Sequence, residues 1–328
     1  MNFSNATVGR AFGTSSAPIW LATVLLFAAS PVVSAGSLDK ASLLSMLPFA
    51  AVLAIAAAGQ TLVVQQRGLD LSVPGMIALG AVLCTNLPQV HGWNLVAAVL
   101  AAVAATAFVG FLNGVLVTWF GVTALVATLG MNTLLLGTVF SIANGTPSGA
   151  TDTLNQFALD RTLGVPNTVL IAVAVVAVAG VVTHRSVVGR RLTAVGVSER
   201  AAAAVGVRVR TYQILAYTFA GLCYGAAGVL LAGYTKTPPL FLGDSYLLPT
   251  VAAVVLGGTA LTGGLASVVS TGVAALFLTQ LGQLLRTLGW SDSQQLITQA
   301  GVLMFVVLAR VLAPRLVGLF RRPVPAPA

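Results

Sequence analysis

The chain has 328 residues, of which 57% are hydrophobic and only 7% are charged, and its mean hydropathy is +0.97. A soluble domain needs a charged surface, so this composition excludes that class and indicates an all-α, polytopic membrane protein. The net charge of +9 does not predict nucleic-acid binding, because the basic residues lie between and after apolar runs and form no stripe on a polar domain.

The first apolar run, at about 17–35, follows a polar tail of residues 1–16 that contains Arg10. A basic residue, an apolar run and the small residues around Ser34 are also the pattern of a cleaved signal peptide. Both interpretations leave the second run starting outside the membrane. We favour an uncleaved first helix that is preceded by a cytoplasmic tail.

Nine further apolar runs follow, so the sequence predicts about ten transmembrane helices, within a range of eight to ten. The eighth run is short for a hydrocarbon core of roughly 30 Å and is expected to be broken or re-entrant. Residues 314–328 form a second polar tail after the last run. The nine runs lie at about 41–64, 73–87, 93–119, 122–143, 162–183, 211–234, 246–258, 265–288 and 295–313.

The charge distribution sets the orientation of these runs. With both ends of the chain in the cytoplasm, twelve of the sixteen Lys and Arg residues fall inside and only Lys40, Arg161, Lys236 and Arg286 fall outside. Cytoplasmic loops are enriched in Lys and Arg, so both termini are expected in the cytoplasm. All four tryptophans also fall at predicted ends of runs. Runs two to five begin outside and runs seven to ten begin inside, which is compatible with an inverted repeat.

The longest charged interruption, 184–212, holds six arginines and one acidic residue, Glu199. Ser198 can cap a short helix there, residues 201–204 are all alanine, and Gly206 can end it. One interpretation is a solvated loop that only fixes the membrane orientation. The other is a helix that docks onto a cytoplasmic partner.

Small and polar residues inside the apolar runs suggest how the helices meet and where a substrate passes. Gly110 with Gly114, and Gly221 with Gly225, have the spacing that lets helix backbones approach closely, and we expect them to pack. Polar side chains at membrane depth are either interhelical hydrogen-bonding groups or contacts for a neutral, hydroxyl-rich substrate. These candidates for a translocation path are Gln60, Asn113, Thr128, Asn132, Tyr217, Tyr224, Gln280 and Gln283.

The runs contain no full charge apart from the residues near their ends, Asp70, Arg286 and Arg310. An ion-coupled pump usually needs a buried titratable relay, so this pattern argues against one. No Gly-Lys-Ser/Thr phosphate loop occurs, and the two histidines have no acid or cysteine spaced to form a metal site or a catalytic triad. We therefore predict no catalytic residue, no metal site and no cofactor bound by this chain.

Short motifs spread over residues 40–312 resemble the permease subunits of ribose-type bacterial ABC sugar importers. Two positions depart from that pattern, namely Pro74, where glycine is usual, and Thr123-Ala124, where Pro-Phe is usual. The resembling stretches are 59–64, 68–73, 113–118, 127–131, 189–191, 194–196, 201–202, 206–207, 252–259 and 263–264.

The resemblance implies a permease domain at 17–313 in the bacterial inner membrane that translocates a ribose-like neutral monosaccharide. It implies a second permease subunit, identical or homologous, a periplasmic or lipoprotein sugar-binding protein, and separate ATPase subunits that use the ATP. A stand-alone secondary transporter and a membrane-embedded enzyme or scaffold are the alternatives. The ATPase subunits are expected to contact a coupling loop at 185–210, including Gly196, Ser198, Glu199, Arg200, Ala201, Ala202 and Gly206.

Overall fold

The computed structural model describes residues 5–291, 293–305 and 308, and this part of the chain is helical almost throughout. Among these described residues, seven helices are long and apolar enough to cross a membrane, and the shortest has 19 residues, which extend about 28 Å at 1.5 Å per residue. The protein is therefore a multi-pass helical membrane protein. The seven helices are α2 (Lys40–Gln65), α3 (Val73–His91), α4 (Leu95–Thr118), α5 (Ala124–Ile142), α7 (Asn167–Arg185), α10 (Val209–Thr235) and α12 (Val268–Thr287).

Two shorter apolar helices occupy expected runs, at Ala17–Val33 and at Asp244–Leu256. The first belongs to α1 (Asn5–Val33), whose helix begins inside the stretch expected to be a tail. The second combines η1 (Asp244–Tyr246) and α11 (Leu247–Leu256), and the ten residues of α11 extend only about 15 Å, as the short eighth run predicts. The last expected run, 295–313, lies partly outside the described residues. The predicted total of about ten helices is thus not confirmed.

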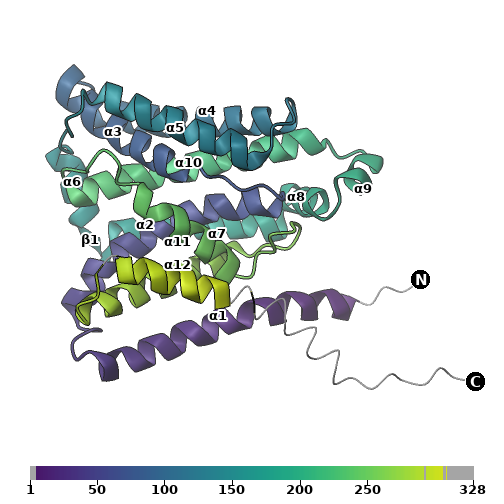
Figure 1. The fold of residues 1–328 in the computed structure, drawn as a ribbon, viewed down its shortest axis with the longest axis horizontal. Helices are drawn as coiled ribbons and strands as arrows, with labels where there is room; N and C mark the ends of the chain where they lie inside the picture. Colours follow the sequence, from purple (N-terminus) through teal and green to yellow (C-terminus); the bar gives the residue numbers. More distant parts are fainter. Residues whose placement is uncertain (1–4, 292, 306–307, 309–328) are drawn as a thin grey trace, which may run out of the picture.

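The helices α2 and α10 form the centre of the molecule (Figure 1). Every residue of α2 from Ala50 to Gln65 is buried, because its apolar side chains face neighbours on all sides. Gly59 allows α10 to approach, since a Cβ added there would lie 2.9 Å from the Cα of Ala220. In Figure 1, α3, α4 and α5 lie on one side of this central pair, and α12 and α1 lie on the other.

Glycines join α4 to α10 as the sequence predicts. Gly110 and Gly114 of α4 face the backbone of α10, where a Cβ at Gly114 would lie 2.8 Å from a Cα atom. Gly221 and Gly225 of α10 face Thr106 of α4, where an added Cβ would overlap existing atoms. The expectation that these four glycines pack at a helix crossing is confirmed. Larger side chains there would separate the two helices.

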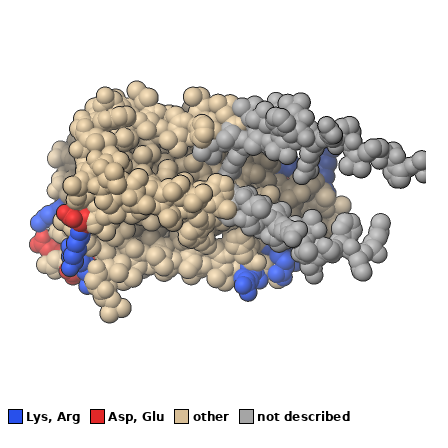
Figure 2. Space-filling view, turned by 90° about the horizontal axis from the view of Figure 1, so that it is seen from below, with Lys and Arg blue, Asp and Glu red and all other residues tan. Residues whose placement is uncertain are grey.

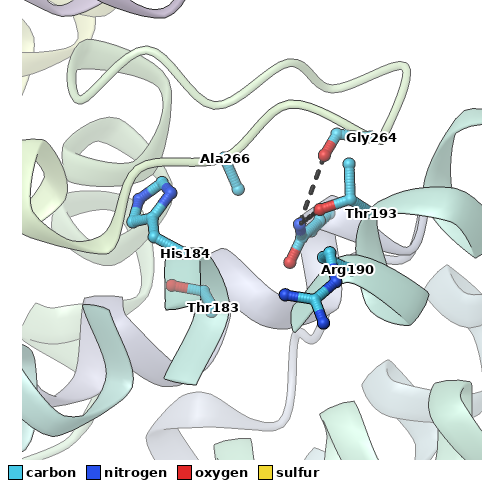
Figure 3. Close-up of a pocket in the computed structure, with 7 residues that line it drawn as sticks. Thr183, His184, Arg190, Thr193, Gly264 and Ala266 are labelled. Carbon is cyan, nitrogen blue, oxygen red and sulfur yellow. Dashed lines mark hydrogen bonds between the residues drawn. The ribbon is translucent and has the colours of Figure 1, made fainter. Parts of the chain in front are cut away.

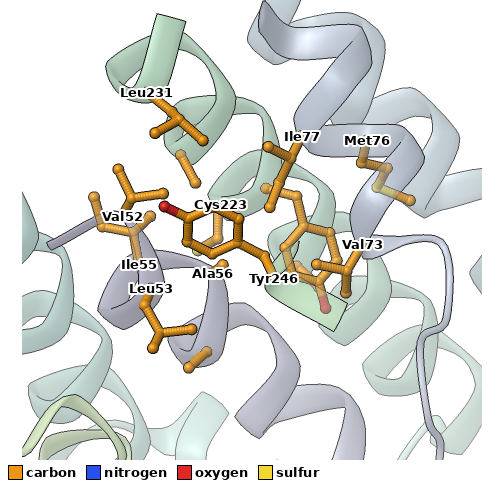
Figure 4. Close-up of a cluster of buried hydrophobic side chains, with 14 of the residues drawn as sticks. Val52, Leu53, Ile55, Ala56, Val73, Met76, Ile77, Cys223, Leu231 and Tyr246 are labelled. Carbon is orange, nitrogen blue, oxygen red and sulfur yellow. The ribbon is translucent and has the colours of Figure 1, made fainter. Parts of the chain in front are cut away.

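Apolar side chains fill the space between α2, α3 and α10 (Figure 4). Ile55 of α2 and Met76 and Ile77 of α3 are completely buried in this cluster, and Leu231 of α10 is 3% exposed. Tyr246 at the end of η1 joins the same cluster. The core thus connects the central helices to the short η1–α11 segment.

On the face drawn in Figure 2, the charged side chains lie toward the two ends of the molecule, with an uncharged band between them. The face in Figure 2 shows Lys and Arg mixed with Asp and Glu at one end, and Lys and Arg alone at the other. The helix α6 (Asp152–Leu159) and the hairpin β1 (Arg161–Thr162) and β2 (Val165–Pro166) lie at the first end, and α8 (Val187–Val197) and α9 (Glu199–Ala204) lie at the second (Figure 1). We call these the α6 end and the α8 end.

Two stretches that the sequence analysis treats as interruptions between runs have regular structure. The polar stretch 144–161 contains α6, whose Asn155 donates to the carbonyl oxygen of Gly233 at 2.8 Å. The stretch 184–212 contains α8, which the sequence analysis does not predict. The signal for α8 is Ser186, whose hydroxyl oxygen accepts a hydrogen bond from the N–H of Gly189 and caps the helix.

Candidate coupling and translocation sites

The helix α9 forms as its sequence predicts. The hydroxyl oxygen of Ser198 accepts from the N–H of Ala201 at 3.3 Å and caps its first turn. Gly206 adopts a positive φ of 82°, and its N–H donates to the carbonyl oxygen of Ala203. A glycine tolerates this left-handed conformation at no steric cost, so the helix stops there.

The side chains of α9 face in two directions. Ala202 is 2% exposed and packs in an apolar cluster with Ala58 and Leu62 of α2, so this candidate coupling residue points into the protein. Its neighbours Arg200, Ala201 and Ala203 are exposed. The exposed edge also includes Val197 and Val205, at 59% and 77% exposure. A partner at the α8 end would therefore meet a small surface of alanine, valine and arginine.

Glu199 also has a partner within the chain. Its carboxylate accepts a hydrogen bond of 2.8 Å from the side-chain amide of Gln213 on α10. The sequence analysis names Glu199 as part of the coupling loop but gives no hint of this contact. The bond joins the start of α9 to α10 at an exposed position.

The end of α2 holds α8 in place. Arg67 donates from Nε to the carbonyl oxygen of Gly196 at 2.9 Å and from Nη2 to that of Val197. One residue earlier, Gln66 donates to the carbonyl oxygen of Leu192 at 2.9 Å. The two bonds from Arg67 satisfy carbonyl groups in the last turn of α8, which have no partner within their own helix. The bond from Gln66 adds a link to the preceding turn of α8.

A glycine-rich loop completes the contact. The N–H of Gly264 donates to the carbonyl oxygen of Gln65 at 2.9 Å, and the side-chain amide of Gln65 donates to Gly264 and Thr193 (Figure 3). Gly263 and Gly264 both have a positive φ of about 85°, which favours glycine. We call this meeting of residues 65–67, 192–197 and 263–264 the three-way junction. Two stretches that carry the family resemblance, 194–196 and 263–264, meet in it, and residues 65–67 lie between two others, 59–64 and 68–73.

A cavity of about 220 Å³ lies beside the three-way junction (Figure 3). Its polar lining includes the side chains of Arg190 and Gln65 on one side and that of His184 on the other (Figure 3). Sequence reasoning did not point to it, because its residues come from α2, α7, α8 and the loop before α12. It is lined by Gln65, Thr183, His184, Arg190, Thr193, Gly264 and Ala266.

Three candidate path residues bind the connection between α2 and α3. Asn113 of α4 donates to the hydroxyl of Ser72 at 2.9 Å. The hydroxyl oxygen of Thr128 accepts from the N–H of Leu71, also at 2.9 Å. On the next turn of α5, the side-chain Oδ1 of Asn132 accepts from the N–H of Gly75 at 2.8 Å.

Pro74 is compatible with this arrangement, because it stands in the first turn of α3. A helix leaves its first N–H groups without intrahelical partners, so a proline there removes no helical hydrogen bond. The departure from the usual glycine therefore leaves the start of α3 intact.

The same connection buries an acidic group. Asp70 is completely buried, and its Oδ1 accepts from the N–H of Ser72 at 2.9 Å and from the Ser72 hydroxyl. Burial raises the pKa of this carboxyl to about 6, and the hydrogen bonds from Ser72 oppose the shift. The sequence analysis places Asp70 near the end of a run, and the structure adds that its side chain is completely buried.

Several buried polar atoms around this connection have no hydrogen-bond partner among the described residues. They are Oδ2 of Asp70, Oδ1 of Asn113, Nε2 of Gln60 and the hydroxyl of Tyr217. Gln60 uses its other side-chain atom to accept from the hydroxyl of Tyr224 at 2.5 Å. Unpaired buried polar groups are costly, so a water or a polar ligand is the natural partner for them.

Gln280 and Gln283 are not brought together with the other candidates. Gln280 donates to the hydroxyl of Ser30 at 2.9 Å and joins α12 to α1. Gln283 donates to the carbonyl oxygen of Ser42 at 3.1 Å and joins α12 to α2. Both are interhelical hydrogen bonds toward the α6 end of the molecule.

The larger described cavity, about 740 Å³, opens between α2, α10, η1–α11, α12 and the helical residues 293–305. None of the eight candidate path residues lines it. Sequence reasoning missed this cavity because its lining combines a short helix with residues on both sides of the turn after α12. Its lining includes Phe49, Tyr246, Leu278, Gly282, Arg286 and Gln299.

Seven long apolar helices in the described part of the chain, with buried polar groups between them, define a multi-pass helical membrane protein. Residues 42–308 match the model of one family, the permease component of the branched-chain amino acid transport system. The chain belongs to this permease family. Its members named below are transport subunits.

Curated relatives agree with the resemblance found in the sequence. The chain is 35% identical to the ribose import permease protein of Escherichia coli over 88% of its own length and 91% of the relative. It is 31% identical to the autoinducer 2 import system permease protein of Escherichia coli, over 83% and 81%. It is 30% identical to the fructose import permease protein of Bifidobacterium longum, over 75% and 71%. No solved structure matches the chain.

Proposed function

We propose that this chain is the transmembrane permease subunit of a bacterial ABC importer for a neutral monosaccharide, ribose or a related sugar. The single observation that carries the proposal is the 35% identity to a ribose import permease over 88% of the chain. The fructose import permease among the relatives is also named for a neutral sugar. Amide, hydroxyl and phenol groups dominate the buried polar network, which suits a hydroxyl-rich cargo.

In this proposal, separate ATPase subunits hydrolyse the ATP and bind the exposed face of α9 and the adjoining part of α8. The docking surface would include Ser198, Glu199 and Arg200 with the exposed alanines, while Ala202 supports α9 from below. The three-way junction supports such a role, because it connects α8 directly to α2 at the centre of the protein. Movement of the ATPase would thereby reach the helices that surround the substrate.

The membrane arrangement is part of the same proposal. Both termini and the α8 end face the cytoplasm, and the α6 end faces the outside of the inner membrane, where a sugar-binding protein delivers its cargo. About ten crossing segments, arranged as two inverted halves, and a second permease subunit complete the transporter. The excess of Lys and Arg over acidic residues at the α8 end supports this orientation.

The inner part of the translocation path would pass the polar groups of Gln60, Asn113, Thr128, Asn132, Tyr217 and Tyr224. Support comes from the unpaired buried atoms of Gln60, Asn113 and Tyr217, which are available to a passing hydroxyl group. Gln280 and Gln283, which join helices nearer the α6 end, would shape the path from outside.

Reconstitution of the complete complex tests the proposal. The chain, its ATPase and its binding protein are placed in liposomes, and ATP hydrolysis and uptake are measured over a panel of pentoses and hexoses. We expect at least one neutral sugar to stimulate hydrolysis and to accumulate. Transport by this chain alone would favour a secondary transporter, and turnover of sugar or lipid would favour an enzyme; either result would overturn the proposal.

Asp70 gives specific support to the secondary transporter as the second candidate. A completely buried carboxyl with a pKa of about 6 can gain and lose a proton near neutral pH. Proton-coupled uptake would then depend on the proton gradient and on Asp70. The family of the relatives nevertheless favours the ABC importer.

A further inference from the structure

The cavity of about 740 Å³ has three polar side chains at one side of its lining, those of Arg286, Gln295 and Gln299. We propose that it is a binding site for the transported monosaccharide, in which Arg286 and Gln299 recognise hydroxyl groups beside Gly282 and Gln295 holds Arg286 in place. The proposal rests on the proposed function and adds the place and the residues of recognition. It concerns a site separate from the buried polar network around Asp70.

The first argument is convergence on a glycine. A Cβ added at Gly282 would lie 3.7 Å from Nε2 of Gln299 and 3.8 Å both from Nη2 of Arg286 and from Oε1 of Gln295. Three polar side chains from two segments therefore surround a position that has no side chain of its own. Gly282 itself is buried in α12. The missing side chain leaves room directly beside the polar groups.

The second argument is an unsatisfied hydrogen-bonding group. Oε1 of Gln299 is buried and has no partner among the described residues. Arg286 donates from Nε to Oε1 of Gln295 at 3.2 Å, which holds the guanidinium beside the cavity. A sugar hydroxyl both donates and accepts, so it can donate to the free oxygen of Gln299 and accept from the guanidinium. A hydrocarbon chain can do neither.

The third argument is the shape and chemistry of the walls. The volume lies within the range of roughly 300–1,000 Å³ that is typical of small-molecule sites, which are mostly apolar with a few placed polar groups. Phe49 forms one wall, and its ring meets that of Tyr234 edge-on at 5.2 Å, which fixes its orientation. The rings of Phe49 and Tyr246 offer apolar surface to the C–H groups of a sugar.

The position of the cavity also suits delivery from outside. Its lining includes Asp244 of η1 and Thr235, the last residue of α10. Lys236 follows Thr235 directly in the sequence. Lys236 forms an exposed ion pair of 3.4 Å with Asp152 of α6. The cavity therefore lies toward the α6 end, which the proposed topology places outside. A sugar released there would enter it before reaching the central helices.

Uptake by the reconstituted complex tests the site with a matched pair of glycines. Gly282→Leu fills the space beside the polar groups, and we expect uptake to fall at least tenfold. Gly301→Leu is the control, because Gly301 belongs to the helical residues 293–305 and has no atom within 4 Å of an added Cβ. It should transport within twofold of the unaltered protein. Equal membrane levels of both variants exclude a folding defect.

The role of Gln299 predicts a change in preference between sugars. Gln299→Leu replaces the hydrogen-bonding amide with an apolar side chain of similar size. The sugar concentration for half-maximal uptake should therefore rise about fivefold to tenfold. The rise should be smaller for a sugar that lacks the recognised hydroxyl. Unchanged uptake by both Gly282→Leu and Gln299→Leu, with the unaltered complex active, would overturn the site and leave the proposed function standing.

Thiol protection tests the site without any transport. In a chain with Cys84 and Cys223 replaced by serine, Gln299→Cys is labelled by a soluble thiol reagent, and the transported sugar should slow labelling at least fivefold. Glycerol at the same concentration should not. If added lipid slows the labelling and the sugar does not, the cavity holds an acyl chain, and the proposal is overturned. An unaltered complex that transports no sugar would instead refute the proposed function.

Discussion

Arg67 binds the carbonyl oxygens of Gly196 and Val197, although 129 residues of sequence separate it from the first of them. One guanidinium therefore connects the end of the central helix α2 to the last two residues of α8, just before α9. Both helices end at this contact, and neither can shift along its axis without breaking it.

The Arg67 contact gives a first prediction. Arg67→Ala removes two charge-assisted hydrogen bonds, so the contact between α8 and α2 should weaken by about 2 kcal/mol. We expect sugar-stimulated ATP hydrolysis to fall at least tenfold, with faster amide hydrogen exchange in α8. Arg161→Ala, at an exposed arginine of the α6 end, is the control and should change neither. Normal coupling in Arg67→Ala would show that the three-way junction does not transmit movement.

The orientation of the chain gives a second prediction. With Cys84 and Cys223 replaced by serine, a cysteine at Leu163, whose side chain is 97% exposed at the hairpin tip, should react with an impermeant thiol reagent in intact cells. A cysteine at Ala203, exposed on α9, should react only after the cells are opened. The reverse pattern would contradict cytoplasmic placement of the α8 end.

The docking surface gives a third prediction. Glu199→Arg reverses the only acidic charge in the 184–212 stretch, and Ala203→Pro removes an N–H inside α9 and breaks the helix. Both variants should reach the membrane at normal levels, lose sugar uptake and co-purify with less ATPase.

The matched control for the docking surface is Leu163→Arg, at the tip of the hairpin of β1 and β2, where the side chain is 97% exposed. Asn155 is unsuitable as a control because its side chain bonds the end of α10. If the Glu199 and Ala203 variants transport normally with the ATPase bound, α9 serves only to orient the chain in the membrane.

Asp70 gives a fourth prediction, about pH. Burial raises its pKa to about 6 from the usual value of 3.8, so the unfolded chain releases this proton more readily than the folded one. The associated stability is fully present below about pH 4 and is lost as the pH rises through about 6. The loss approaches about 3 kcal/mol at neutral pH, because a tenfold change in proton affinity corresponds to about 1.4 kcal/mol.

Thermal unfolding in detergent at several pH values measures this effect. The unaltered protein should lose stability between pH 4 and pH 7, and Asp70→Asn, which stays neutral, should lose less. Asp152→Asn, at an exposed carboxyl of the α6 end, should follow the unaltered protein. If Asp70 instead made the protein more stable as the pH rises over this interval, the buried position of its carboxyl would be contradicted.

The energy source gives a fifth prediction. The proposed substrate is neutral, and the ATPase drives the transport, so uptake should continue when a protonophore is added and cellular ATP is held constant. The measurement is the initial rate of sugar uptake in cells. Loss of uptake under these conditions would favour proton coupling, and abolition of uptake in Asp70→Asn would then identify the carrier of the proton.

The sequence alone determined the class, the family resemblance and several local elements. Long apolar runs can only form helices in a membrane, because every backbone hydrogen bond must be made within the segment, and this fixed most of the helices. Local signals also sufficed for α9, where Ser198 caps the helix and Gly206 ends it. The role of the glycine pairs in α4 and α10 could be predicted from the sequence, because this spacing is typical of close helix–helix packing in membranes.

Only the tertiary structure decided which polar residues act together. Asn113, Thr128 and Asn132 hold the connection that follows α2, whereas Gln280 and Gln283 bind different helices, and no spacing within a single run distinguishes these two outcomes. The burial of Asp70, the bonds of Arg67 to α8 and the polar groups around Gly282 all join residues far apart in sequence. Such contacts depend on how whole helices pack, and the pattern along one helix carries no information about the side chains of its neighbour.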